Sequence, residues 1–393
     1  MTRPALRVIG TSVTLTREVR RRAALDLGFP VEFEVLDGVD CQRRGIMSPD
    51  SYDVYDQWFH SLDLLWTAVS VQPIETTRLR RWGDLRLPGT PEVFRRGRGT
   101  RPGDVLFVQP ERTLGPEPPP GEPPRIAMLP TAYNMDSFAY STGSGSVSGS
   151  GSGPEQPESW SWLLDDGYHA RAYLSADPAA SAVELALAVQ SAGLMQIKDV
   201  GDLSIEEIDE MFGHLMVMRR AGHFGRFWNS SEDSVRAMSG SGPIIGAMWS
   251  PAYYALRASG SPLTYAAPAE GYRGWHSGLS ISAATDGERL DMAYDYLNWW
   301  LDGVPGAIMA RQGYYMSVVE PLRGTLTESE WNYWYGGEPA VEDLSGRDGT
   351  IARRGERREG GSYLQREARV VVWSTIMPEH NYLIRRWREF LDG

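Results

Sequence analysis

Polar and aromatic side chains stand where several predicted strands end. Apolar runs predict strands at residues 5–9, 52–55 and 243–249. In sheets of parallel strands, ligands bind at the carboxyl ends of the strands. The side chains at or just beyond these ends are Thr11, Ser12, Asp56, Gln57, Trp58, Trp249 and Ser250. The sequence therefore predicts a ligand site at such an edge.

A second group of candidates lies later in the chain. Alternation from Trp275 through Ser277 to Ile281 predicts a strand, and a helix over residues 286–301 follows it. A Gly-Tyr-Tyr turn then leads into another short apolar run. We expect this stretch to connect two lobes twice and to place Trp275 and Tyr314 in the cleft between them.

The run PTAYNMDSFAYS, at residues 130–141, is built like a buried strand but carries polar side chains. Polar groups in a buried strand need partners. A bound ligand would be one such partner, which makes Asn134 and Asp136 candidate contacts. Hydrogen bonding within a hinge is the alternative role for Asp136.

Enzyme signatures are absent from the sequence. It contains no GxSxG or HExxH motif, no P-loop and no dinucleotide fingerprint. A carboxylate pair of Asp56 and Asp136, used for glycoside chemistry, is the hydrolase alternative. We expect a protein that is not an enzyme and that needs no cofactor.

Paired tyrosines offer a metal-binding alternative. Tyr314 and Tyr315 form one pair, Tyr253 and Tyr254 form another, and phenolate oxygens are hard ligands suited to Fe³⁺. A ferric site would also want a histidine or glutamate nearby. The six histidines show no ligand spacing. We therefore predict no metal site and keep ferric binding as the alternative.

Charge and cysteine content exclude several classes of protein. The net charge of −12 and the pI near 5.1 argue against a nucleic-acid partner, which needs a basic face. Cys41 is alone, so no internal disulfide is possible. No run approaches the ~18 apolar residues of a membrane helix, and residues 1–15 lack the apolar core of a signal peptide. We expect either an intracellular protein or a mature form whose export signal has been removed.

The remaining elements alternate strand and helix, as in a parallel sheet with helices on its faces. The 393 residues can fill two lobes, because single cores rarely grow past about 250–300 residues. The predicted elements include a helix at 16–27, a strand at 31–36, a helix at 62–68, short strands at 105–108, 125–129 and 170–174, a helix capped by Asp177, a helix opened by the capping box Ser204 to Glu207, and a helix at 231–238.

An ordered series of motifs gives the chain a family resemblance. The motifs are GTS, YDVYDQW, PTAYNMDSFAY, LSADP, IIGAMWS, GWHSGLSISAAT and QGYYMSV. In this order they resemble the extracellular solute-binding proteins of ABC importers, closest to the polyamine (spermidine/putrescine) branch. The resemblance implies an α/β fold of two lobes, the type II periplasmic-binding-protein fold, with hinge crossings. The lobes would be 1–135 with 276–318, and 136–275 with 319–393, with a flexible Ser/Gly loop at 141–153.

The resemblance also assigns roles to residues. In polyamine binders, aromatic rings flank the methylene chain and carboxylates hold the ammonium ends; rings attract cations by about 0.5–2 kcal/mol each. Two acidic positions of that pattern are Ala180 and Ser277 here, so a smaller or singly charged amine is expected in place of spermidine. The expected ligand contacts are Thr11, Ser12, Asp56, Trp58, Asn134, Asp136, Asp177, Trp249, Trp275, Ser277 and Tyr314.

The same resemblance implies partners and a location. The protein would capture a small cationic or amino-bearing solute, polyamine-like or amino-acid-like, and present it to a membrane ABC permease. It would act as a monomer, in the periplasm or at the cell surface. Residues 323–375 have no role in this picture.

Overall fold

The computed structural model describes residues 4–87, 89–90, 100–142, 157–346, 349–375 and 377–393. The chain divides into two compact units. Unit 1 comprises Met1–Thr90, Thr100–Asn134 and Trp275–Trp331, and unit 2 comprises Pro91–Gly99, Met135–Gly274 and Asn332–Gly393. The predicted Ser/Gly loop lies outside the described residues from position 143 onward.

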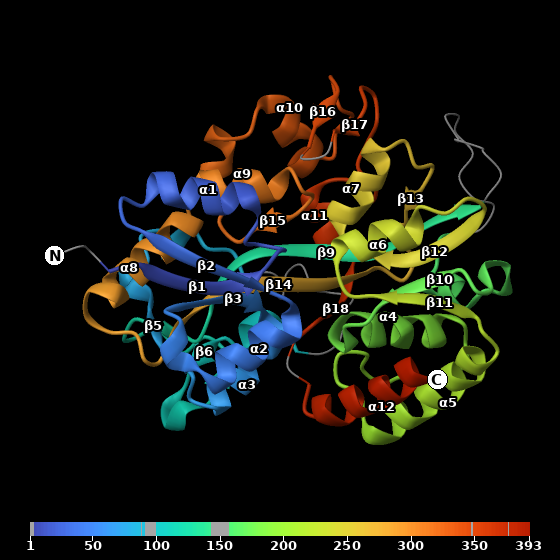
Figure 1. The fold of residues 1–393 in the computed structure, drawn as a ribbon, viewed down its shortest axis with the longest axis horizontal. Helices are drawn as coiled ribbons and strands as arrows, with labels where there is room; N and C mark the ends of the chain where they lie inside the picture. Colours follow the sequence, from blue (N-terminus) through green and yellow to red (C-terminus); the bar gives the residue numbers. More distant parts are fainter. Residues whose placement is uncertain (1–3, 88, 91–99, 143–156, 347–348, 376) are drawn as a thin grey trace. The chain divides into compact units, whose positions relative to one another are not determined.

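Unit 1 is built on a sheet in which the first strand lies in the middle (Figure 1). β1 (Leu6–Thr11) pairs in parallel with β2 (Val31–Leu36) and with β3 (Val54–Trp58). β3 then pairs antiparallel with β14 (Tyr272–Ser282). The same unit contains α1 Arg17–Asp26, α2 Gly38–Met47, α3 Leu62–Thr67, β4 Val71–Gln72, β5 Ile74–Glu75, β6 Phe107–Val108, β7 Leu114–Gly115, β8 Arg125–Ile126, the start of β9 (Leu129–Thr142), α8 Gly287–Trp300, α9 Gly303–Ala310, β15 Tyr315–Met316 and α10 Glu328–Trp331.

Unit 2 repeats this pattern of pairing. β10 (Ala172–Ser175) lies between β11 (Phe224–Trp228) and β12 (Pro243–Met248) and is parallel to both, and β12 pairs antiparallel with β9. The unit also contains a 3₁₀ helix Trp160–Leu164, α4 Pro178–Ser191, α5 Ile205–Arg220, α6 Ser231–Met238, α7 Ser250–Ala258, β13 Thr264–Tyr265, a π-helical turn Asn332–Gly336, β16 Leu344–Ser345, β17 Thr350–Ala352, α11 Tyr363–Glu367, β18 Val370–Trp373 and α12 His380–Asp392.

The parallel strands confirm the predicted α/β class, and the repeated order is that of two similar lobes. In each unit the first strand is central, the second and third flank it, and an antiparallel strand follows. The chain passes between the units within β9 and within β14. Both were predicted as crossing strands.

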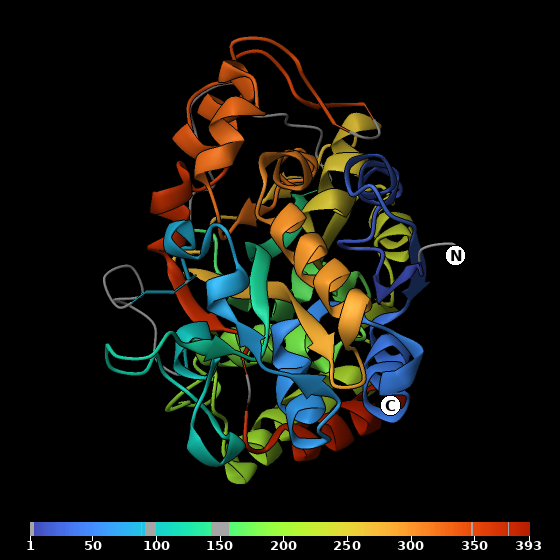
Figure 2. The ribbon, with the colours of Figure 1, turned by 90° about the vertical axis from the view of Figure 1, so that its left-hand side faces the viewer.

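Apolar packing fastens the C-terminal helix to unit 2. Figure 2 shows α12 (red) beside α5 (yellow-green). Trp387 and Phe390 of α12 pack against Phe212 of α5, with ring centroids 6.4 and 5.9 Å apart. Arg219 adds hydrogen bonds to the carbonyl oxygens of Phe390 and Leu391. None of the helices in the described ranges has the length and apolar character needed to cross a membrane.

The predicted strand at residues 52–55 lies two residues too early. β3 runs from Val54 to Trp58, so Asp56 and Trp58 belong to the strand itself and do not follow it. The reason is the antiparallel partner: pairing with β14 extends as far as Ser277 opposite Trp58, beyond the pairing with β1. The predicted apolar strand at 125–129 is also divided, into β8 and the start of β9.

Candidate functional site

Five predicted contacts lie at one edge of the unit 1 sheet. Thr11 ends β1, and Gly10 beside it pairs in parallel with Asp56 of β3. Trp58 ends β3 and lies opposite Ser277 of β14. Ser12 follows β1 and is exposed. The carboxyl ends of β1 and β3 and the adjoining part of β14 therefore form a common edge.

Trp275 and Tyr314 form an aromatic pair within unit 1. Their ring centroids lie 5.5 Å apart, with an angle of 82° between the rings, and both side chains are buried. Such edge-to-face geometry is favoured by the ring quadrupoles. Tyr315 pairs with Tyr133 of β9 in antiparallel register, which brings Tyr314 level with Asn134. The two rings therefore contact each other, and their predicted place in a cleft stays a prediction.

The indole of Trp58 is held in a fixed orientation at the same edge. It stacks on His60 with centroids 5.7 Å apart and 21° between the rings. Gly38, at the start of α2, lies against the ring, and a Cβ there would be 2.5 Å from Trp58 Cζ3. A glycine is therefore required at position 38 for this ring position. Ser277 donates a hydrogen bond to the carbonyl oxygen of Ala132, 3.2 Å away.

Asp56 is the carboxylate among the unit 1 candidates, and its side chain is fully buried. Oδ1 accepts a 2.8 Å hydrogen bond from Thr14 Oγ1, and Oδ2 has no hydrogen-bond partner among the described residues. Burial raises the pKa of this carboxyl to about 7, and the Thr14 bond offsets only part of the rise. Its role as a solute contact stays a prediction.

Unit 2 presents a comparable edge at the carboxyl ends of its parallel strands. Ser175 at the end of β10 pairs with Trp228 at the end of β11. Trp249 follows β12, and its ring lies 4.8 Å from that of Trp228 at an angle of 89°. Trp228 is buried, whereas Trp249 is half-buried. This edge therefore carries a second perpendicular aromatic pair.

Asp177 caps helix α4 at the same edge. Its Oδ1 accepts a 2.9 Å hydrogen bond from the N–H of Ala179, and its own N–H donates to Ser175 Oγ at 3.1 Å. The capping role predicted from the Asp177-Pro178 sequence is confirmed. Asp177 as a residue is half-buried.

Asp136 is joined to a buried cation that the sequence analysis did not identify. Arg273 Nη2 lies 3.1 Å from Asp136 Oδ2, and Arg273 Nε lies 2.9 Å from Glu184 Oε1. The three side chains are at most 3% exposed. Burial opposes the charge on Arg273, but the two carboxylates outweigh it and raise the guanidinium pKa, while burial raises the pKa of Glu184.

Residues beyond the predicted set thus contribute to the unit 2 edge, namely Trp228, Glu184 and Arg273. Two signals in the sequence could have identified the charged pair. Arg273 is a lone charge in the otherwise buried strand β14, and Glu184 is a lone charge in an apolar helix. Glu184 also lies seven residues after Asp177, two helical turns along the same face.

A small cavity adjoins this network in unit 2. Its volume of about 20 Å³ leaves room for about one water molecule. Ala179 and Ser374 contribute to its walls, together with His380 at the start of α12. The cavity is too small for a solute of several heavy atoms.

The structure gives no added support to the ferric or the hydrolase alternative. Tyr253 and Tyr254 are buried, and burial raises the pKa of Tyr253 to about 12, which disfavours a phenolate ligand. Within the described residues, no group of three or more histidine, cysteine, aspartate or glutamate side chains could hold a metal ion. For a hydrolase, Asp136 is already paired with Arg273, and Asp56 is fully buried.

Comparison with known proteins shows which family and which solved folds this chain resembles. Residues 125–318 match the family profile described as bacterial extracellular solute-binding protein. No curated protein sequence matches the chain significantly. Among solved structures, the spermidine/putrescine ABC transporter substrate-binding protein PotD from Streptococcus pneumoniae is similar with a TM-score of 0.61 at 12% identity, over 99% of this chain and 100% of that one.

Two further solved structures are comparably similar. The periplasmic binding protein AgtB from A. tumefaciens R10, in complex with agropinic acid, has a TM-score of 0.60 at 12% identity over 100% of both chains. The Atu4243–GABA receptor has a TM-score of 0.60 at 12% identity, over 99% of this chain and 98% of that one. Residues 125–318 are thus similar to the bacterial extracellular solute-binding protein family, and the fold of the whole chain is that of the periplasmic binding proteins of ABC transporters.

Proposed function

We propose that this protein is the substrate-binding component of an ABC transporter for a small cationic or amino-bearing solute. It binds the solute without chemical conversion and presents it, as a monomer, to a membrane permease. It works in the periplasm or at the cell surface. The candidate contacts are Thr11, Ser12, Asp56, Trp58, Asn134, Trp275, Ser277 and Tyr314 from unit 1, and Asp136, Asp177 and Trp249 from unit 2.

The observation that carries this proposal is an aromatic pair at the carboxyl edge of the strands in each unit. Trp275 packs on Tyr314 in unit 1, and Trp249 packs on Trp228 in unit 2. An ammonium group over such a ring gains about 0.5–2 kcal/mol. Solved relatives of this fold carry names or ligands that include spermidine/putrescine and GABA, all of which contain amines.

The acidic groups favour an amine of low charge. Asp177 is half-buried and lies at the same edge as Trp249. Asp136, by contrast, already neutralises Arg273. Ala180 and Ser277 stand where the polyamine pattern has further acids. A solute with one ammonium near Asp177 therefore matches these side chains better than spermidine does.

Thermal-shift screening tests the proposal directly, because a ligand that binds only the folded protein raises its melting temperature by mass action. The panel contains spermidine, putrescine, GABA, betaine, common sugars and Fe³⁺. We expect the largest shift from a small amine. A shift from Fe³⁺ alone, or turnover of a glycoside panel, would contradict the proposal.

Matched variants then test the site. Trp275→Ala and Asp177→Ala should each weaken binding of the best amine about tenfold or more, measured by titration calorimetry. Trp82→Ala removes a half-buried tryptophan of another edge-to-face pair in unit 1, and Asp37→Ala removes another N-cap, at α2. Both controls should bind within about twofold of the wild type. Unchanged binding in both site variants would mean that the site lies elsewhere.

A further inference from the structure

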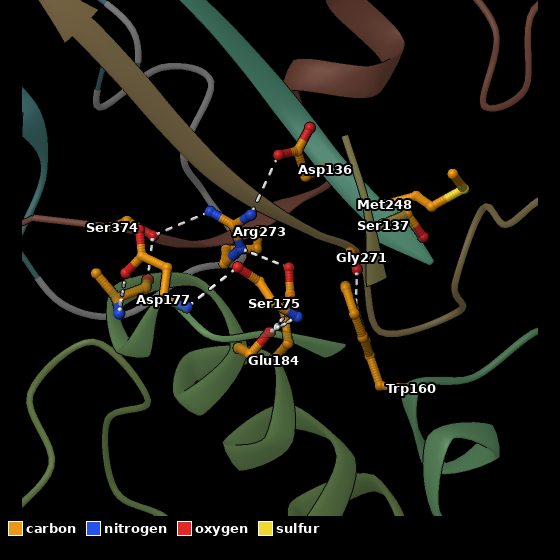
Figure 3. Close-up of polar contacts among 12 residues, drawn as sticks. Asp136, Ser137, Trp160, Ser175, Asp177, Glu184, Met248, Gly271, Arg273 and Ser374 are labelled. Atoms are coloured by element: carbon orange, nitrogen blue, oxygen red, sulfur yellow. Dashed lines mark hydrogen bonds and ion pairs between the residues drawn. The ribbon is translucent and has the colours of Figure 1, made fainter. Parts of the chain in front are cut away.

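A continuous chain of hydrogen bonds leads away from Asp177. The N–H of Asp177 donates to Ser175 Oγ at 3.1 Å, and the N–H of Ser175 donates to Ser181 Oγ at 2.9 Å. Ser181 Oγ then donates to Glu184 Oε2 at 3.3 Å. Figure 3 shows this network at the start of α4. The end of β10 is thereby tied to a carboxylate two turns along the helix.

The chain continues through Arg273 to a second predicted solute contact. Arg273 Nε donates to Glu184 Oε1 at 2.9 Å, and Nη2 donates to Asp136 Oδ2 at 3.1 Å (Figure 3). A branch runs from Arg273 Nη1 to Ser374 Oγ at 3.2 Å, and Ser374 Oγ donates to the carbonyl oxygen of Ala179 at the same distance. The N–H of Ala179 is the group that Asp177 caps. The branch therefore returns to the starting residue.

This network lies beside both points at which the sheet strands pass from one unit to the other. Arg273 precedes by two residues the point at which β14 enters unit 1, and Asp136 follows by two residues the point at which β9 leaves that unit. Asp136, Glu184 and Arg273 are all nearly inaccessible to water. Charged hydrogen bonds in such surroundings are strong and hold their partners in fixed geometry. An isolated ion pair would involve two residues only. This network connects two predicted solute contacts, Asp177 and Asp136.

We propose that Arg273 is a positioning residue for solute binding. Acting through Glu184 and Ser181, it fixes the Asp177 cap and the Asp136 carboxylate in the arrangement that the solute meets, and it does not touch the solute itself. The inference rests on the proposed function, since Asp177 and Asp136 matter here as solute contacts.

Two variants interrupt the chain of hydrogen bonds without leaving a large cavity. Glu184→Gln keeps the size of the side chain and removes its charge, and Ser181→Ala removes only the bridging hydroxyl. Glu356→Gln is the matched control, because Glu356 pairs with Arg257 in the same unit but takes no part in the chain. Circular dichroism and the melting temperature establish that each variant is folded.

The first measurement needs no ligand. Hydrogen–deuterium exchange of peptides covering residues 175–181 reports how firmly the Asp177 cap is held. We expect exchange about tenfold faster or more in Glu184→Gln and Ser181→Ala, and unchanged in Glu356→Gln. Exchange at the wild-type rate in both test variants would overturn the inference.

The second measurement is binding of putrescine and of GABA by titration calorimetry. Glu184→Gln should raise the dissociation constant about five- to twentyfold, and Glu356→Gln should leave it within about twofold. In an Asp177→Asn background, Ser181→Ala should add less than about twofold, because Ser181 lies on the branch that leads to Asp177. A full additional loss in that background would overturn the positioning role. If the wild type binds neither compound, the proposed amine class fails, and the exchange measurement still decides whether Arg273 holds the cap.

Discussion

At the scale of single residues, the two buried carboxylates on β3 and β9 have opposite surroundings. Asp136 lies against the guanidinium of Arg273, so its charge is compensated. Asp56 has one neutral donor, Thr14, and no hydrogen bond to Oδ2 from the described residues. Burying an uncompensated carboxylate is costly, and the pKa of the group rises instead. The surroundings, and not the residue type, set the charge at neutral pH.

Asp56 should therefore make the protein less stable as the pH rises. Its pKa is about 7 in the folded protein and about 3.9 in an unfolded chain. Between these values the unfolded chain loses the proton while the folded one keeps it, so stability falls from about pH 4 to about pH 7. The full difference is on the order of 4 kcal/mol. Asp56→Asn cannot ionise, so its free energy of unfolding relative to the wild type should increase by several kcal/mol over this range.

Urea unfolding at pH 4.5, 6 and 8 measures this difference. Asp295→Asn is the control, since Asp295 is exposed on α8 in the same unit. Its stability should follow that of the wild type at every pH. Parallel curves for Asp56→Asn and the wild type would show that the buried carboxylate is ionised at no cost, contrary to the expectation.

At the scale of elements, the sequence predicted best where local pattern and tertiary packing agree. The Asp177-Pro178 cap and the Ser204 to Glu207 capping box each begin a helix as expected. The signals are local, because a side chain within three residues satisfies the first free N–H groups. Helix α2 went unpredicted, since only Cys41 and Gly45 are buried on it and it has no apolar stripe.

The residues of the candidate site could likewise be predicted only where a local pattern marks them. Aromatic residues at strand ends, such as Trp249 and Trp275, could be identified because strand ends are visible in the sequence. Their ring partners could not all be identified, since Trp228 ends the short strand β11, which has no alternating pattern. Likewise, nothing local shows that Arg273 meets Glu184, which lies 89 residues earlier in the chain. Contacts of this kind depend on the sheet order.

Arg366, a buried arginine of α11, joins the C-terminal segment of unit 2, Asn332–Gly393, to earlier residues of that unit. Arg366 Nη2 donates to the carbonyl oxygen of Met135 at 2.8 Å, Nη1 pairs with Glu359 at 2.8 Å, and the guanidinium lies 4.6 Å from the centroid of the Tyr272 ring. Removing one partner of a buried ion pair costs about 3–5 kcal/mol. Arg366→Met should therefore lower the free energy of unfolding by about that amount.

Urea unfolding followed by circular dichroism gives the measurement. Arg354→Met is the control, because Arg354 is an exposed arginine of the same segment and should change stability by less than about 0.5 kcal/mol. Equal stability of the two variants would mean that the segment is held by its apolar contacts alone, such as Trp334 on Tyr254.

At the scale of the whole molecule, the two units repeat one strand order but divide the predicted contacts unequally. Unit 1 contributes mainly aromatic and hydroxyl groups, and unit 2 contributes Asp136, Asp177 and Trp249. The protein as a whole has a net charge of −12. A field of this sign draws cations toward the protein and has little effect on molecules without net charge. Salt screens it, with a Debye length of about 30 Å at 0.01 M and about 10 Å at 0.1 M.

The association rate of a cationic solute should therefore fall as salt rises. For putrescine, which carries two positive charges, we expect a decrease of about three- to tenfold between 10 and 300 mM NaCl, within the range of electrostatic steering. GABA is a zwitterion without net charge and serves as the control, with an expected change below twofold. Stopped-flow tryptophan fluorescence gives the rates, since the rings of Trp249 and Trp275 are predicted to contact the solute. Equal salt dependence for the two compounds would show that local contacts, and not the acidic molecule as a whole, set the rate of capture.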